Sequence, residues 1–135
     1  MNLSLAINHI QWIPVLVTTL LSFALGMAWH QPFLFGKHWA KENNPNRITK
    51  KINAPLIFGG TAIMHLVLLA SLSAIVAGTG AAQGALAGLI LSLCFLLPPF
   101  AGTYLFAGRS LKLLALDWGM YAVLFTLSGL LLGAW

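Results

Sequence analysis

Four long apolar stretches dominate the chain, and polar residues gather in the segments between them. The stretches cover about residues 10–30, 55–77, 83–106 and 113–134. Each is long enough for a helix that crosses a bilayer, since such a helix needs about 20 apolar residues. Asn53 precedes Pro55 at the start of the second stretch, as expected for a helix N-cap with proline in the first turn. The pattern predicts an all-α bundle of four transmembrane helices, with residues 1–135 forming one domain.

Composition supports this prediction and excludes two other classes of protein. Of the residues, 59% are hydrophobic and 7% are charged, whereas a soluble domain carries about 25% charged residues. The two acids, Glu42 and Asp117, are too few for a water-facing surface. Intrinsic disorder is excluded because disordered chains combine low hydrophobicity with high charge. The single cysteine, Cys94, can form no disulfide within the chain. The expected surroundings are therefore a lipid bilayer.

The basic residues predict how the chain is oriented. Five of the seven lie between Lys37 and Lys51, and the other two are Arg109 and Lys112. Lys and Arg in short loops mark the cytoplasmic side of a membrane protein. The segment of about residues 33–52 and the turn before the fourth stretch are therefore predicted to be cytoplasmic, with both termini outside. Because the net charge of +5 resides in these two loops, we expect no nucleic-acid binding.

Aromatic residues agree with this orientation, because tryptophan prefers the membrane interfaces. Trp29, Trp39 and Trp118 would lie near the inner interface, and Trp12 and Trp135 near the outer one. The segment of residues 32–39 mixes aromatic and basic side chains. This mixture is typical of a stretch that lies at the level of the lipid headgroups.

A weak internal repeat relates the two halves of the chain. Leu34-Phe35-Gly36-Lys37 follows the first stretch, and Leu105-Phe106-Ala107-Gly108-Arg109 follows the third. Each half would then be a helix, a basic loop and a returning helix, related by an axis along the membrane normal, as in some transporters. The alternative is a chance similarity among common apolar residues.

Small residues recur every four positions on the second and third stretches. They are Ala70, Ala74 and Gly78 on the second, and Gly80, Gly84 and Gly88 on the third. Small residues at this spacing let two helix backbones approach closely in lipid. Because only a short turn joins these helices, we expect the two small faces to pack on each other; the alternative is a dimerisation face. Gly129 and Gly133 on the fourth stretch are candidates for contact with another chain.

A candidate polar path crosses the second and third stretches. His65 lies about 16 Å into the second, near the midplane, where an ionisable residue marks a function by default. Cys94 falls at a similar depth. Pro98 and Pro99 break the third helix, and the carbonyls they free need other partners in lipid. We therefore expect this break to face the bundle interior, either as the hinge of a transport path or as a structural kink. The alternative for His65 is a neutral side chain bonded to a freed carbonyl.

Asp117 is the one acid within or near an apolar stretch, about 6 to 8 Å from the cytoplasmic interface. A carboxylate at that depth should pair with a cation or take up a proton. Arg109 is close in sequence, Tyr121 lies one turn further on the same helix face, and His30 ends the first stretch at the same level. We expect an ion-pair latch between Asp117 and Arg109, or another cation of the cytoplasmic side such as Lys112, assisted by Tyr121 and His30. The alternative is a proton-binding or cation-binding carboxylate.

The sequence does not support an enzyme. It lacks the HExxH, CxxC and G-x-S-x-G patterns. One histidine and one cysteine do not make a metal site, which usually takes three or four ligands. A haem held by two histidines would need a partner for His65 at the same depth. We therefore expect no catalytic residues, no metal and no cofactor.

Two segments resemble the bacterial domain-of-unknown-function 1761 family. The first is Gly26-Met27-Ala28-Trp29-His30-Gln31-Pro32-Phe33-Leu34-Phe35-Gly36-Lys37-His38-Trp39. The second is Tyr104-Leu105-Phe106 with Arg109-Ser110-Leu111, followed by Asp117, Gly119 and the end Gly133-Ala134-Trp135. Where the family carries Asn before Tyr and an acid before Arg, this chain has Thr103 and Gly108. The resemblance covers essentially the whole chain. It implies a small four-helix protein of the bacterial inner membrane, and it implies no activity.

Two hypotheses of function remain. One chain of four helices offers little interior, so we expect a homo-oligomer or a partner membrane subunit. The first hypothesis is a small transporter or channel-like oligomer whose path runs near His65. The alternative is a non-catalytic accessory or assembly subunit of a larger membrane complex. They differ in whether the purified protein is a self-contained oligomer.

Overall fold

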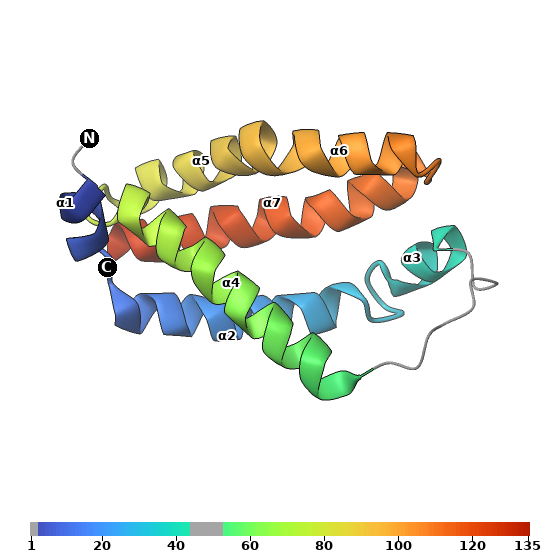
Figure 1. Cartoon of the computed structure of the whole chain (residues 1–135), viewed down its shortest axis with the longest axis horizontal. Helices are drawn as coiled ribbons and strands as arrows, with labels where there is room; N and C mark the ends of the chain where they lie inside the picture. Colours follow the sequence, from blue (N-terminus) through green and yellow to red (C-terminus); the bar gives the residue numbers. More distant parts are fainter. Residues whose placement is uncertain (1–2, 44–52) are drawn as a thin grey trace.

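The protein is a helical bundle, seen here in a computed structural model that describes residues 3–43 and 53–135 (Figure 1). Within these ranges the elements are α1 (Leu3–Asn8), α2 (Trp12–Trp29), α3 (Gly36–Glu42), α4 (Ala54–Val76), α5 (Ala81–Leu91), the π-helical segment η1 (Ser92–Leu96), α6 (Leu97–Phe106) and α7 (Leu111–Ala134). Residues 44–52, which belong to the predicted cytoplasmic loop, lie outside the described part.

Four helices are long and apolar enough to cross a membrane, which confirms the prediction of four spans. They are α2, α4, the continuous run of α5, η1 and α6, and α7. In Figure 1 the short helix α1 and the C-terminus lie at one end of the bundle, which we call the terminal end. The helix α3 and the turn between α6 and α7 lie at the other, which we call the loop end.

Local signals explain where these helices begin and end. The Asn53 side chain accepts a hydrogen bond from the Leu56 N–H (3.3 Å), so the predicted N-cap of α4 is confirmed. Ser110 caps α7 in the same way, through the Lys112 N–H (3.2 Å). Between α4 and α5, Gly78 and Gly80 adopt φ values of 74° and 95°. Glycine suits this left-handed region because it has no Cβ to clash with the backbone.

The glycines of α5 pack against α7, so the predicted pairing of the second and third spans was wrong. A Cβ built on Gly84 would lie 2.1 Å from the Gly129 carbonyl oxygen, and one on Gly88 would lie 2.1 Å from that of Phe125. The Gly80 N–H donates to the Gly133 carbonyl (2.9 Å). Gly129 and Gly133, predicted as contacts for another chain, therefore face α5 of the same chain.

Glycine spacing shows that a helix allows close approach, but not which helix approaches it. Gly129 and Gly133 of α7 lie opposite the glycines at the start of α5, whereas the small residues on the corresponding face of α4 are mainly alanines. Ala70 is buried in the core, Ala74 is half-buried, and Gly78 has open space around it. The short turn allows α4 to cross the bundle at an angle while α5 runs along α7 (Figure 1).

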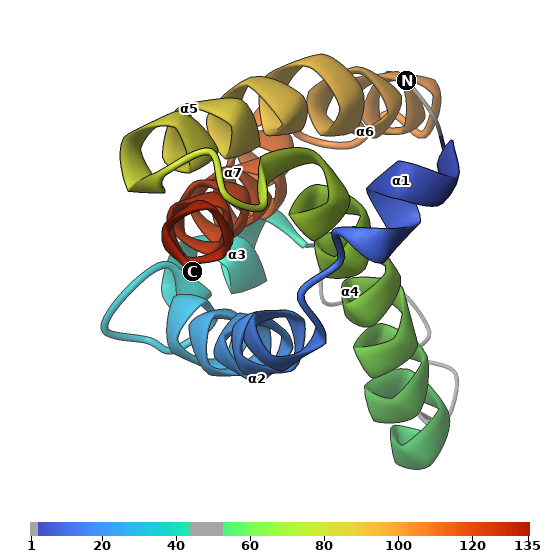
Figure 2. The same cartoon turned by 90° about the vertical axis from the view of Figure 1, so that its left-hand side faces the viewer.

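The core lies mainly in the terminal half of the bundle, around α7. Figure 2 shows α7 between α5 and α2, with α4 along one side. An apolar cluster fills the space between α2, α4 and α7; its buried members are Val15, Leu69, Ala70, Leu72, Val76, Phe125 and Leu132. Towards the loop end α4 splays away from α6 and α7 (Figures 1 and 2). Leu56, Ile57 and Phe58 of that half are accordingly exposed.

Candidate functional site

Asp117 on α7 accepts two hydrogen bonds from aromatic side chains of other elements. The Trp39 Nε1–H of α3 donates to Oδ1 (2.9 Å), and the Tyr104 hydroxyl of α6 donates to Oδ2. Hydrogen bonds to an ionised acceptor are among the stronger ones in proteins. These two bonds satisfy both carboxylate oxygens and join α3, α6 and α7 at the loop end.

Arg109 does not form the ion pair that we predicted with Asp117. Its guanidinium lies over the Tyr104 ring, 4.9 Å from the centroid, and its Nη2 donates to the Asn43 Oδ1 (3.1 Å). Within residues 3–43 and 53–135 no ion pair with Asp117 is present. The physical reason is that Tyr104 lies between the two charges. The Tyr104 hydroxyl donates a hydrogen bond to the Asp117 carboxylate, and the face of the Tyr104 ring contacts the Arg109 guanidinium.

The two other residues of the predicted latch lie close to this network without a hydrogen bond to Asp117 in the described part. The His30 ring meets the Trp39 ring edge-on, with centroids 5.2 Å apart, and its Nδ1 lies 2.8 Å from the Gly26 carbonyl oxygen. Tyr121 lies one turn beyond Asp117 on α7 and is directed toward the middle of the bundle, where its ring packs on His65 (centroids 5.9 Å apart).

His65 is buried at the centre of the bundle, with 6% of its surface exposed. It is the middle residue of α4, which has 23 residues, so it lies about 16 Å from either end. Its Nδ1 is 3.0 Å from the Ser22 Oγ of α2. The rings of Phe23 and Tyr121 meet it edge-on, each at 5.9 Å. Three spans, α2, α4 and α7, therefore converge on this imidazole.

The hydrogen bonds of Ser22 fix the tautomer of His65. The Ser22 hydroxyl donates its one proton to the Thr19 carbonyl (2.6 Å), so toward His65 it can only accept. The proton of a neutral His65 is therefore on Nδ1, and Nε2 carries the lone pair. In the described part of the chain no hydrogen bond reaches Nε2. That nitrogen is free to take a proton.

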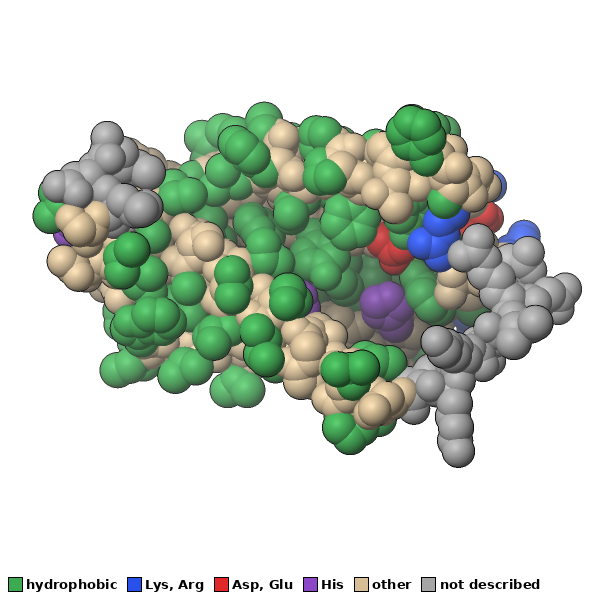
Figure 3. Space-filling view, in the orientation of Figure 1, with side chains coloured by type: hydrophobic (Ala, Val, Ile, Leu, Met, Phe, Trp, Pro, Cys, Tyr) green, Lys and Arg blue, Asp and Glu red, His purple; other side chains and the backbone are tan. Residues whose placement is uncertain are grey.

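Asp117, Tyr121, His65 and Ser22 thus form a polar row from the loop end to the middle of the bundle. Figure 3 shows a hollow between α6 and the splayed half of α4, with acidic, basic and histidine side chains on its floor. Beyond His65, toward the terminal end, the side chains of the apolar cluster close the bundle. Val15, Leu69, Val76 and Leu132 have no exposed surface. The row therefore opens toward the loop end.

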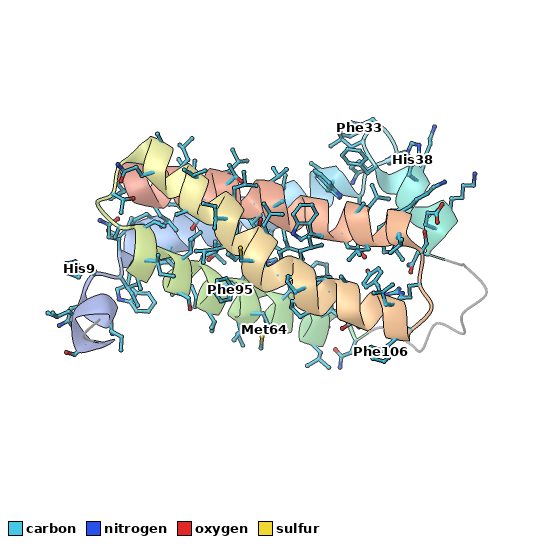
Figure 4. The ribbon with its side chains drawn as sticks, turned by 90° about the horizontal axis from the view of Figure 1, so that it is seen from above. His9, Phe33, His38, Met64, Phe95 and Phe106 are labelled. Carbon is cyan, nitrogen blue, oxygen red and sulfur yellow. The ribbon has the colours of Figure 1, made fainter. Side chains whose placement is uncertain are left out.

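Cys94, Pro98 and Pro99 do not belong to this row, so the third-span part of the predicted path was wrong. All three are exposed, and Pro99 lines a groove of about 370 Å³ beside Phe100, Tyr104 and Arg109 rather than a path to His65. Met64 and Phe106 point away from the other helices (Figure 4), whereas Phe95, although exposed, lines a groove beside Leu68 and Leu72 of α4. Depth along a helix does not fix the direction of a side chain, and the π-helical turn of η1 changes the facing of the residues around it.

The neighbouring helix α7 donates one side-chain hydrogen bond to the π-helical segment before the two prolines. The Ser92 carbonyl accepts the Leu97 N–H, the i→i+5 bond of a π-helix, and also the Trp118 Nε1–H of α7 (3.1 Å). A side chain donating to an irregular stretch is one way in which a membrane helix tolerates proline. The observed arrangement agrees with a structural kink that α7 braces.

The sequence pointed to His65, Asp117 and Tyr121 as candidates, but the residues that contact them were not predicted. Trp39 and Tyr104 bind the carboxylate, and Ser22 binds the imidazole. Ser22 stands on an apolar helix one turn from Thr18 and Thr19, and this line of hydroxyls could have indicated a polar face. Among the described residues no group of three or more His, Cys, Asp or Glu side chains could hold a metal ion.

Comparison with known proteins places the chain in a family. The family described as "Protein of unknown function (DUF1761)" matches residues 13–133, a range that starts in α2 and ends in α7. No match was found to a curated protein or to a solved structure. Because the match covers nearly the whole chain and all four spans, the protein belongs to the DUF1761 family.

Proposed function

We propose that this protein is a small transporter or channel-like protein in which His65 takes up and releases a proton. The observation that carries the proposal is the buried imidazole with its Nδ1 bonded to Ser22 and its Nε2 without a hydrogen bond in the described residues. An ionisable side chain at mid-membrane depth is costly and is a functional site by default. Among the described residues Nε2 is not one of the fully buried polar atoms without a partner, so it keeps some accessible surface through which a proton can reach it.

In this proposal the proton moves along the polar row between the loop end and His65. Asp117 is the first ionisable group, and Tyr104 and Trp39 hold its carboxylate in place. Tyr121 follows one turn deeper, with its ring 5.9 Å from His65. A proton delivered along this row binds the lone pair of Nε2 and gives an imidazolium. On the other side of the ring, the Ser22 oxygen still accepts the hydrogen bond from the His65 Nδ1–H.

The apolar cluster on the terminal side has a consequence for this mechanism. A proton on His65 can return to the loop end, but its onward passage requires α4 to move relative to α2 and α7. Transporters expose one central site to the two sides of the membrane in turn. In this proposal the structure corresponds to a state open to the loop end, which the basic residues assign to the cytoplasm, in the bacterial inner membrane.

The hollow beside α4 favours an assembly rather than a lone chain. Polar groups at membrane depth face the interior of a bundle or a water-filled cavity, not lipid. In a monomer the hollow of Figure 3 would open sideways into the bilayer. We therefore propose that a second copy of the chain covers it.

A second candidate function is an accessory subunit of a larger membrane complex. The exposed apolar half of α4, with Leu56, Ile57 and Phe58, fits a different protein as well as a second copy. In that case the role of His65 would be to hold the helices together for assembly with the partner. The purified protein alone would then have no stable oligomeric state and would not transport protons.

The test is proton flux into liposomes that hold the purified protein and a pH-sensitive dye. A potassium gradient with valinomycin supplies the driving voltage. We expect flux from the wild type, its loss in His65→Gln, and normal flux in the control His9→Gln, which changes an exposed histidine. If wild-type liposomes are no more permeable to protons than empty ones, the accessory function is the better account.

A further inference from the structure

A groove at the loop end lies between α2, α3 and α7 and has a volume of about 520 Å³. Its floor is apolar and includes Trp29, Phe35, Leu116 and Gly119. The Trp29 Nε1–H donates to the Leu116 carbonyl (3.1 Å), and its ring packs on Phe35 with centroids 4.4 Å apart. These contacts hold the indole against α7. The floor is therefore a fixed surface rather than a gap between loose side chains.

The rim of this groove is charged. Lys41 and His38 come from α3, Lys112 from the first turn of α7, and Glu42 adds the one acid. Two lysines against one glutamate leave one net positive charge while His38 is neutral. Both lysines are exposed, so their ammonium groups are available to a ligand. A phosphodiester, which carries one negative charge, complements this rim.

A second apolar groove, of about 410 Å³, lies between the same two helices, α2 and α7, closer to the terminal end. Leu21, Ala24 and Ala28 of α2 line it, with Leu124 and Leu127 of α7 opposite. These α2 residues lie on a different face from Ser22, which contacts α4. The seam is therefore a lateral furrow on the side that α4 does not cover (Figure 2).

We propose that these two grooves together bind one anionic phospholipid. Its phosphate lies on the rim between Lys41 and Lys112, and an acyl chain follows the α2–α7 seam. Basic pockets between helices on the cytoplasmic side are typical sites for anionic headgroups. The two features fit one amphiphile, because the charged rim and the apolar seam follow each other in the order of headgroup and chain. A free phosphate would leave the seam and the floor unused.

The experiment is native mass spectrometry of the purified full chain with equal amounts of phosphatidylglycerol and phosphatidylcholine of the same acyl chains. We expect wild type to retain one phosphatidylglycerol in preference. Each lysine near an anionic surface strengthens binding by about fivefold, so the joint change Lys41→Gln and Lys112→Gln should weaken phosphatidylglycerol binding by about 25-fold. The control Lys37→Gln removes an exposed lysine of α3 that does not line the groove, and it should retain the lipid as wild type does.

A second pair of variants tests the acyl seam. Ala24→Phe would fill the seam and should lower retention of the lipid. Leu20→Phe changes an exposed residue of the same helix outside the seam and should not. Equal loss from Lys37→Gln and the double variant would overturn the site, as would equal retention of the two lipids by wild type. Displacement of the lipid by inorganic phosphate alone would show a plain anion site instead.

Discussion

The Ser22 hydroxyl of α2 and the His65 imidazole of α4 meet 3.0 Å apart in the middle of the bundle. Both side chains are polar and buried at the level of the membrane interior. In lipid such a pair does two things at once. It ties two spans together, and it fixes which imidazole nitrogen remains open to a proton.

Replacing Ser22 by Ala should destabilise the protein, because it leaves the Nδ1–H of His65 buried without an acceptor. The cost of such an unsatisfied donor is about 1–3 kcal/mol. Thermal unfolding in detergent measures it. The control is Ser71→Ala, since Ser71 is exposed and, among the described residues, bonds only to the Val67 carbonyl of its own helix. If the two variants unfold alike, the Ser22–His65 contact contributes nothing to stability.

Asp117 should be coupled energetically to Tyr104 rather than directly to Arg109. The Tyr104 hydroxyl donates to the carboxylate, and a hydrogen bond to a charged group contributes about 1.5–3 kcal/mol. A double-mutant cycle of Asp117→Asn with Tyr104→Phe should therefore show a clear coupling energy in thermal unfolding. The cycle with Arg109→Gln should show a smaller one, because the guanidinium reaches the carboxylate only through the Tyr104 ring. A larger coupling energy of Asp117 with Arg109 than with Tyr104 would instead support a direct ion pair between Asp117 and Arg109.

Gly84→Ala should separate α5 from α7. The added Cβ would lie 2.1 Å from the Gly129 carbonyl oxygen, and backbone atoms cannot move aside without shifting a helix. We expect a loss of about 1–3 kcal/mol or of folded protein altogether. The control is Gly59→Ala, which meets nothing within 4 Å and should gain about 0.5–1 kcal/mol of helix stability. Folded yield and thermal unfolding in detergent report both effects.

The spans could be predicted because the bilayer itself sets the length of an apolar helix. The ionisable residues His65 and Asp117 could be identified for a related reason, since polar groups within apolar runs stand out. The N-cap at Asn53 was predictable because capping depends on residues near each other in the chain. These features depend on local sequence or on the membrane, so one sequence is enough to see them.

The partners of these residues could not be predicted, because they depend on how each helix is rotated in the bundle. Trp39 is 78 residues from Asp117 in sequence, and no local pattern links the two. The π-helical segment η1 gives a sharper example. Its extra residue changes the helical phase, and Cys94, expected near His65, faces outward. The glycines of α5 likewise indicated a close contact without naming α7 as the partner.

The orientation in the membrane stays a prediction, and single-cysteine labelling tests it. In a background with Cys94→Ala, one variant carries Thr79→Cys, in the exposed turn between α4 and α5, and another carries Ala40→Cys, on the exposed side of α3. Because Lys and Arg of the two basic loops mark the cytoplasmic side, a membrane-impermeant maleimide added to intact cells should label residue 79 and not residue 40. Permeabilised cells are the control, in which both should react. Labelling of residue 40 alone in intact cells would reverse the orientation, and the polar row from Asp117 to His65 would then open to the outside.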